Sequence, residues 1–255
     1  MKPTGTRAYS DAMRIRIVVA NIQSGIGVTK GYRQYLTSSW RYVLPHPGHG
    51  AYDAGVFLKE ESVDITLLTE VDAGSKRSRG ISQLETMSRE ASLSHMQFFP
   101  TRSVGSSINE GSAILARYPI AATRSHALSS NVHPRVLGET VLAIEASPVT
   151  VLVAHLALNA KAREVQIAEI AKRVQQVEGP VILGGDFNER NHRAFKHLKA
   201  SGLTPISVPG YPSWKPLHSL QVLFLSSHFP DTTVSVPSSK AFSDHLPLII
   251  ETELA

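Results

Sequence analysis

The 255-residue sequence contains no cysteine, which excludes a disulfide framework, a thiolate metal site and a cysteine nucleophile. Charged residues are scarce, at 18%, whereas hydrophobic residues make up 42% and supply enough apolar surface for a sizeable core. This balance is not that of a disordered chain. The absence of cysteine does not indicate a compartment, because a protein without cysteine tolerates both oxidising and reducing conditions.

Long hydrophobic runs are also missing. No stretch approaches the roughly 18 apolar residues that span a membrane, and no apolar run precedes Arg14 as it would in a secretory signal. We therefore expect no transmembrane segment and a cytoplasmic location. Residues 1–12 are expected to form a disordered arm, followed by a single domain over residues 13–255.

Acidic residues are absent between residues 12 and 52. Within that stretch, residues 30–44 interleave basic and aromatic side chains. These are Lys30, Tyr32, Arg33, Tyr35, Trp40, Arg41 and Tyr42. Together with a net charge of +5, they favour an anionic partner. Basic residues mixed with aromatic ones suit a nucleic-acid face and equally a membrane surface; alternatively, the aromatic side chains pack a helix onto the protein while the arginines stay solvated.

A second basic segment, residues 74–80, directly follows the strand candidate that ends near Glu70. Two interpretations of it are open. The segment either reaches a substrate phosphate or is a solvated loop.

Short runs rich in Val, Ile and Leu recur at strand length, bounded by Gly, Pro, Asn, Asp or Ser. They are Ile15–Ala20, Ile65–Thr69, Ser112–Ala116, Thr140–Ile144, Val149–Ala154, Val181–Leu183, Val222–Leu225 and Leu246–Ile250. A hairpin turn is predicted at Ala146-Ser147-Pro148. Helical periodicity predicts helices over Lys161–Val177, Gln83–Ala91 and Tyr32–Leu44. With no internal repeat, this order favours an α/β fold of packed sheets with helices outside.

Five strand candidates end in, or directly follow, an acid, amide or imidazole. The side chains concerned are Asn21, Glu70, His155, Asp186 with Asn188, and Asp244 with His245. Strand ends on one rim of a sheet can converge on one cleft, which here would be rich in oxygen ligands. Such a set, without clustered His or Cys, favours Mg²⁺ over Zn²⁺. A metal there would polarise a phosphoryl oxygen, and the imidazoles would move protons.

The order and local sequence of these motifs resemble the endonuclease/exonuclease/phosphatase superfamily of DNase-like, metal-dependent phosphoesterases. The matching segments within residues 14–252 are 19–23, 67–72, 111–120, 154–156, 184–188 and 243–247, and residues 211–216 resemble its bacterial members. The most specific is Gly184-Gly185-Asp186-Phe187-Asn188, since paired glycines are needed where the backbone turns tightly or is closely approached. The resemblance implies a four-layer α/β sandwich of two packed, mainly antiparallel sheets flanked by helices.

The resemblance also implies a metal site. It places metal binding on Glu70, with Asn21 and Asp244 beside it. The ion implied is Mg²⁺, with Mn²⁺ as a substitute.

The same resemblance implies catalytic roles. His245 would be the general base, oriented by Asp244, and Asp186 would contact the nucleophile or the leaving oxygen. Asn188 and His155 would bind the phosphate.

One position departs from the family pattern. Gln221 stands where the family usually has an Asp, and a neutral amide neither accepts a proton nor holds a second metal strongly. We therefore expect one metal, with Gln221 in hydrogen-bond contact with Asn188, Asp186 or the substrate phosphate.

The sequence thus predicts a magnesium-dependent hydrolase of phosphate esters that acts by in-line attack of water. A phosphodiester is favoured over a monoester by the resemblance of His155 to the DNase-like and sphingomyelinase-like members. A nuclease and a hydrolase of phospholipids or small phosphodiesters both remain open. A third reading is a phosphate- or polyanion-binding module that lost turnover through Gln221.

Overall fold

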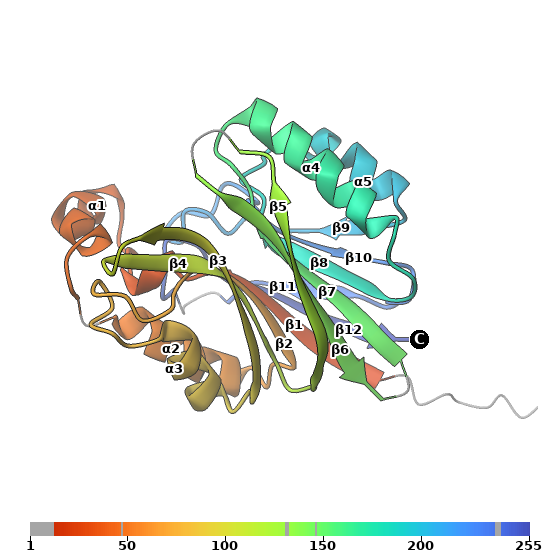
Figure 1. Cartoon of the computed structure of the whole chain (residues 1–255), viewed down its shortest axis with the longest axis horizontal. Helices are drawn as coiled ribbons and strands as arrows, with labels where there is room; N and C mark the ends of the chain where they lie inside the picture. Colours follow the sequence, from red (N-terminus) through yellow and green to blue (C-terminus); the bar gives the residue numbers. More distant parts are fainter. Residues whose placement is uncertain (1–12, 47, 131–132, 146, 238–240) are drawn as a thin grey trace, which may run out of the picture.

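The computed structural model describes residues 13–46, 48–130, 133–145, 147–237 and 241–255. These residues form two six-stranded sheets that pack face to face, with helices on the outer sides (Figure 1). The predicted four-layer α/β sandwich is therefore confirmed. The predicted N-terminal arm, residues 1–12, and Ala146 of the predicted hairpin turn lie outside the described residues.

The first sheet has the strand order β11-β12-β1-β2-β4-β3. Its strands are β1 (Met13–Asn21), β2 (Ile65–Asp72), β3 (His95–Val104), β4 (Ile108–Ala116), β11 (Thr233–Ser235) and β12 (Leu248–Leu254). β1 and β2 are parallel, and the other neighbours are antiparallel. Asn21 pairs with Thr69, so the carboxyl ends of β1 and β2 lie at one edge.

The second sheet has the order β5-β6-β7-β8-β10-β9. Its strands are β5 (Ile120–Leu128), β6 (Arg135–Ile144), β7 (Ser147–His155), β8 (Val181–Asp186), β9 (Thr204–Ile206) and β10 (Gln221–Leu225). β7 and β8 are its parallel pair, and their last residues, His155 and Asp186, lie side by side.

Five α-helices and three short 3₁₀ turns occur in the described part of the chain. They are α1 (Tyr32–Ser38), α2 (His49–Glu60), α3 (Gln83–Ala91), α4 (Ala160–Val174), α5 (Lys196–Ala200), η1 (Gln23–Gly25), η2 (Ser39–Tyr42) and η3 (His192–Phe195). The Asn159 side chain accepts from the N–H of Ala162 and caps α4, as its sequence favours. Among these helices, none is both long and apolar enough to cross a membrane.

Three apolar clusters hold the layers together. Ile17, Leu67 and Val151 belong to the cluster between the two sheets. A second cluster packs α2 and α3 on the first sheet, and a third packs α4 and α5 on the second. Because central strands are covered on both faces, their sequences are continuous apolar runs, which is why they were recognisable.

The elements missed from the sequence have weaker signals. β5 is largely exposed at a sheet edge, and its sequence shows no apolar run. α2 contains Gly55, where a Cβ would lie 2.7 Å from Glu90 Cβ on α3, so the close approach of the two helices requires the glycine. The helix predicted over Tyr32–Leu44 is in fact α1 followed by η2.

Candidate active site

One amide joins the two sheets at the edge where the parallel strands end. Asn21 Nδ2 donates to Glu70 Oε1 at 2.9 Å and to Asp186 Oδ2 at 3.0 Å. Asn21 and Glu70 belong to the first sheet, whereas Asp186 ends β8 of the second. The predicted convergence of these three side chains is therefore present in the structure.

Glu70 owes its orientation to an irregularity in β2. The register between β2 and β4 shifts between Leu68 and Val71, and Glu70 has a φ of 56°. Bulges of this kind re-aim a side chain, and a non-glycine residue at positive φ is strained. Burial raises the pKa of Glu70 to about 8, and the nearby carboxylates of Glu110 and Asp244 add to the effect.

The two glycines before Asp186 have separate steric reasons. A Cβ on Gly185, whose φ is 144°, would lie 1.9 Å from the carbonyl oxygen of Ala154. A Cβ on Gly184 would be pressed into the core between the sheets. Beyond them, Asn188 turns back at a φ of 51°, and its N–H donates to Asp186 Oδ1 at 3.0 Å.

His245 faces Asp186, but Asp244 does not orient its ring as predicted. His245 Nε2 lies 3.7 Å from Asp186 Oδ2, longer than a hydrogen bond. The Asp244 carboxylate accepts instead from Tyr35 OH at 2.5 Å and from Ser243 Oγ at 3.1 Å. Among the described residues, the buried His245 Nδ1 has no hydrogen-bond partner. The ring packs on Tyr211, with centroids 4.6 Å apart.

Gln221 pairs with Asp186 across β8 and β10, as the resemblance implied. Its hydrogen bonds differ from those expected. With the amide oriented to satisfy both neighbours, the oxygen accepts from Asn21 N at 2.7 Å and the nitrogen donates to Leu246 O at 2.6 Å. Gln221 therefore bridges the backbone of β1 and the segment after His245, instead of contacting Asn188 or Asp186.

A cleft of about 400 Å³ opens above these groups. It is lined by six of the residues predicted for the site and by several that were not predicted for it. The predicted ones are Glu70, His155, Asp186, Asn188, Asp244 and His245; the additional ones include Tyr42, Arg102, Glu110, Arg135, Arg190 and Tyr211. Asn21 and Gln221 are buried.

Arg135 is the most informative of the additional residues. Its Nη1 donates to the carbonyl oxygen of His155 at 3.1 Å, and within the described ranges no carboxylate forms an ion pair with it. Burial lowers its pKa, while Glu70 and Asp186 oppose the effect. The strand predicted over Thr140–Ile144 begins earlier in the structure, at Arg135. The apolar Val136 and Leu137 were the available signal for the earlier start.

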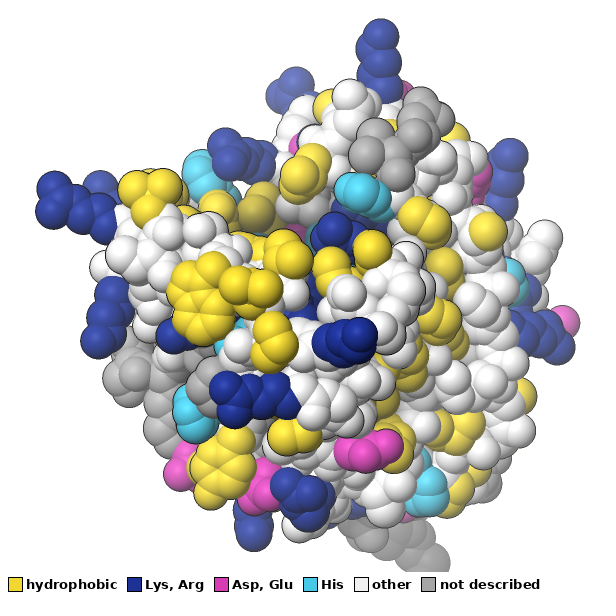
Figure 2. Space-filling model, turned by 60° about the vertical axis from the view of Figure 1, so that its left-hand side comes forward, with side chains coloured by type: hydrophobic (Ala, Val, Ile, Leu, Met, Phe, Trp, Pro, Cys, Tyr) yellow, Lys and Arg dark blue, Asp and Glu magenta, His cyan; other side chains and the backbone are white. Residues whose placement is uncertain are grey.

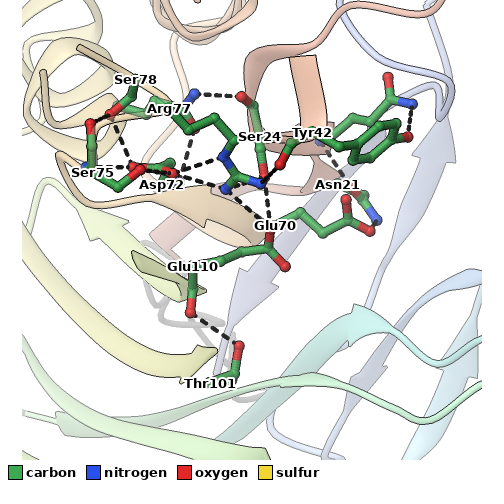
Figure 3. A network of polar contacts seen from close by, with 12 residues as sticks. Asn21, Ser24, Tyr42, Glu70, Asp72, Ser75, Arg77, Ser78, Thr101 and Glu110 are labelled. Atoms are coloured by element: carbon green, nitrogen blue, oxygen red, sulfur yellow. Dashed lines mark hydrogen bonds and ion pairs between the residues drawn. The ribbon is translucent and has the colours of Figure 1, made fainter. Parts of the chain in front are cut away.

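The basic segment 74–80 fits neither of its predicted interpretations at Arg77, which is buried. Arg77 donates from Nε and Nη2 to Asp72 Oδ2 at 3.0 and 2.8 Å, and from Nη2 to Glu110 Oε2 at 3.1 Å (Figure 3). Ser75 and Ser78 also donate to Asp72. Arg77 thus fixes Glu110 at the cleft, because breaking a buried ion pair costs about 3–5 kcal/mol.

His155 lines the cleft yet is surrounded by protein. Burial lowers its pKa to about 4, against the opposing charge of Asp186. The ring is therefore neutral at pH 7. A neutral imidazole offers one donor and one acceptor to a phosphate without adding charge.

The charge of the cleft fits a divalent cation. Glu70, Glu110, Asp186 and Asp244 bring four carboxylates together. Burial is the main cause of the raised pKa of Glu70, and repulsion from Glu110 and Asp244 adds to it. The described residues hold no ready-made group of three or more His, Asp or Glu at metal-ligand spacing. Mg²⁺ needs only one or two carboxylates, since it keeps several waters. Glu70 is the carboxylate best placed to hold it.

The two other predicted metal ligands are placed differently. Asn21 Oδ1 accepts from Gln23 N at 2.9 Å, so its amide nitrogen, not its oxygen, faces the carboxylates. Asp244 is engaged by Tyr35. Direct metal binding by Asn21 and Asp244 stays a prediction.

Residues 34–245 match the model of the Endonuclease/Exonuclease/phosphatase family. The chain therefore belongs to this family, whose members are generally metal-dependent phosphoesterases. No curated protein sequence matches the chain.

Solved structures share the fold. An endonuclease/exonuclease/phosphatase from Beutenbergia cavernae matches with a TM-score of 0.72 and 17% identity, covering 95% of this chain and 72% of that one. The mannosyl-6-phosphatase of Bacteroides thetaiotaomicron matches with a TM-score of 0.68 and 17% identity over 93% and 99%. The human Nocturnin catalytic domain matches with a TM-score of 0.66 and 20% identity over 95% and 94%. At these identities the likeness extends to the fold alone.

The bridge made by Gln221 predicts a pH-dependent stability difference. In Gln221→Glu, an oxygen replaces the N–H that donates to Leu246 O, so we expect a loss of about 1–3 kcal/mol near neutral pH. In the folded state, repulsion between the new carboxylate and the carbonyl oxygen of Leu246 raises the pKa of the new carboxyl group. The loss should therefore shrink on acidification, when the protonated acid can donate again.

Gln221→Ala is the matched control for this experiment, because it removes both hydrogen bonds at every pH. Denaturant titrations at neutral and acidic pH measure the differences. If Gln221→Ala unfolded like the wild type, the bridge would contribute nothing, and if the Glu variant showed no pH trend, the donor to Leu246 would be misassigned.

The low pKa of His155 predicts a second pH effect. The unfolded chain gains a proton near pH 6.5, whereas the folded ring gains one only near pH 4. Stability is therefore lost as the pH falls through this window. His155→Gln cannot be protonated, so its free energy of unfolding should fall less between these pH values. The exposed His197→Gln on α5 is the control, and equal pH slopes for the wild type and His155→Gln would contradict the placement.

Proposed function

We propose that the protein is a magnesium-dependent hydrolase of phosphodiesters. The observation that carries this proposal is the cleft itself, which is lined by Asp186, Asn188, His155 and His245 together with the carboxylate of Glu70. The family provides the reaction class, and the arrangement of these side chains supports the individual roles.

The base in this proposal is His245 Nε2. Its distance of 3.7 Å from Asp186 Oδ2 means that the nitrogen is not committed to that carboxylate. With the ring proton on Nδ1, the lone pair of Nε2 accepts a proton from water as the water oxygen bonds to phosphorus. The bond to the leaving oxygen breaks on the opposite side, and that oxygen takes its proton from solvent.

The phosphate would be held by donors with spare capacity. Asn188 Nδ2 uses one N–H for the carbonyl of Leu156 at 3.0 Å, which leaves its second N–H free for a phosphoryl oxygen. The unpaired guanidinium N–H groups of Arg135 and the neutral ring of His155 are further donors. When bound at Glu70, Mg²⁺ would polarise a phosphoryl oxygen and stabilise the charge that develops in the transition state.

The choice of a diester over a monoester rests on the resemblance of His155 to the phosphate-contacting histidine of the DNase-like and sphingomyelinase-like members. The charge of the cleft does not decide between them, because Arg102, Arg135 and Arg190 line it together with the carboxylates of Glu70, Asp186 and Asp244.

Removal of the metal tests the proposal. EDTA should abolish hydrolysis of bis-p-nitrophenyl phosphate, and added Mg²⁺ or Mn²⁺ should restore it. Glu70→Gln should weaken metal binding, so that the half-saturating metal concentration rises by about tenfold or more, which corresponds to roughly 1.4 kcal/mol. Because Glu70 is repelled by its neighbours, this variant should unfold at an unchanged or higher temperature.

The exposed Glu85→Gln on α3 is the control and should leave metal dependence unaltered. Full activity in EDTA would refute the metal assignment. Tight binding of phosphate esters without turnover by the wild type would instead support the binding module that lost catalysis.

A further inference from the structure

An apolar patch lies on α1, η2 and the two residues that follow η2. We define it by five side chains, which are Tyr32, Leu36, Trp40, Val43 and Leu44. Leu36 is 80% exposed, Val43 62% and Leu44 55%. Exposed apolar groups of this size, gathered in one place, mark a site of interaction.

The patch is not the outer side of a packed helix. Ser38 is the residue that α1 buries, and η2 buries none of its described residues. The interpretation in which aromatic side chains pack residues 32–44 on the protein therefore holds only in part, because Tyr32 and Tyr35 contact Trp214 whereas Trp40 belongs to no buried cluster of the described residues. In Figure 1, α1 lies at the left, outside the layers of the sandwich.

Contacts from the same segment fix it beside the cleft. Tyr35 donates to Asp244, and Tyr42 lines the cleft while accepting from Gln23 Nε2 at 3.0 Å. Tyr32 packs edge-on against Trp214, with centroids 5.3 Å apart. The patch is thus held at the rim of the proposed active site.

A further apolar side chain borders the same cleft. Leu158 lines it and is 79% exposed. Figure 2 shows hydrophobic side chains gathered on this face, interspersed with Lys and Arg. Exposed apolar groups both in the patch and at the cleft suit a partner with an extended apolar surface.

The charged side chains of the segment that carries the patch are of one sign. Lys30 and Arg33 are exposed, and Arg41 lies over the Trp40 ring at 5.4 Å. No Asp or Glu occurs from residue 12 to residue 52. A basic rim around apolar side chains is complementary to a bilayer that carries anionic headgroups.

The kind of exposed apolar side chain indicates whether the partner is a membrane or a nucleic acid. Nucleic-acid faces use exposed rings on which bases stack, but Leu36, Val43 and Leu44 are aliphatic and cannot stack. The Tyr35 ring is also turned toward Trp214 and Asp244. Aliphatic groups gain free energy by leaving water for the acyl boundary of a bilayer.

We propose that this patch docks on the surface of an anionic phospholipid membrane and presents the cleft to the phosphodiester of a lipid headgroup. The inference rests on the proposed phosphodiesterase function for its choice of substrate. Docking itself requires only the exposed side chains and their basic rim.

Vesicle sedimentation of the full chain tests the docking. The variant Leu36→Ser/Val43→Ser/Leu44→Ser removes three aliphatic groups that contact neither the cleft nor the core. We expect the wild type to sediment with phosphatidylcholine vesicles that contain phosphatidylglycerol, and the triple variant to bind them at least tenfold more weakly. Turnover of bis-p-nitrophenyl phosphate should be unchanged in the variant.

Met96→Ser/Val234→Ser is the matched control, because both side chains are exposed but lie on edge strands outside the patch. It should sediment like the wild type. Lys30→Glu/Arg33→Glu should lose the preference for phosphatidylglycerol over pure phosphatidylcholine, and its binding should depend less on salt.

The outcomes separate the two proposals. If the wild type hydrolyses the soluble diester but does not sediment, the membrane proposal is overturned and the proposed function stands. If it sediments through the patch but hydrolyses no diester, the surface stands and the function fails. If the triple variant loses binding to DNA while the wild type ignores vesicles, the patch is a nucleic-acid face and the membrane proposal is wrong.

Discussion

The side-chain amide of Asn21 is the interaction on which the arrangement of the cleft depends. Its two N–H groups are donated to carboxylates of different sheets, Glu70 and Asp186, which would otherwise repel each other. The main-chain N–H of Asn21 is held in turn by Gln221. The position of β1 in the first sheet therefore sets the separation of the two acids, and the core between the sheets keeps that position.

Around this amide, the cleft brings charges of both signs together, because Arg102, Arg135 and Arg190 line it beside the carboxylates. Behind the cleft, the buried Arg77 forms ion pairs with both Asp72 and Glu110. Burial raises the pKa of Glu70, the neighbouring carboxylates of Glu110 and Asp244 add to the effect, and the hydrogen bond from Asn21 opposes it. A site of this kind gains stability from a divalent ion, and the strained backbone at Glu70 is maintained because the sheets on both sides fix it.

The sequence was sufficient for residues whose signal is local. Asn21, Glu70, His155 and Asp186 were found because each ends a buried strand. The glycine pair was recognised as a place where the backbone turns tightly or is closely approached, and the structure shows that the carbonyl of Ala154 approaches Gly185. The remaining groups could not be found in this way. Arg77 sits in a run of basic and small residues that has the composition of a solvated loop, and its burial depends on Glu110, distant in sequence. Likewise, the hydrogen bonds of Gln221 depend on where the backbones of Asn21 and Leu246 meet in space.

Periodicity in residues 32–44 showed that apolar side chains recur, but not what covers them. The structure shows that no core of the described residues does so, and that the segment has two tasks at once. Tyr35 holds the carboxylate of Asp244, while the next residue, Leu36, is the most exposed member of the apolar patch. Because consecutive residues of one short helix serve the cleft and the surface, a partner bound to the patch restrains the same helix that positions Asp244. Surface binding and the geometry of the cleft are therefore physically coupled through α1.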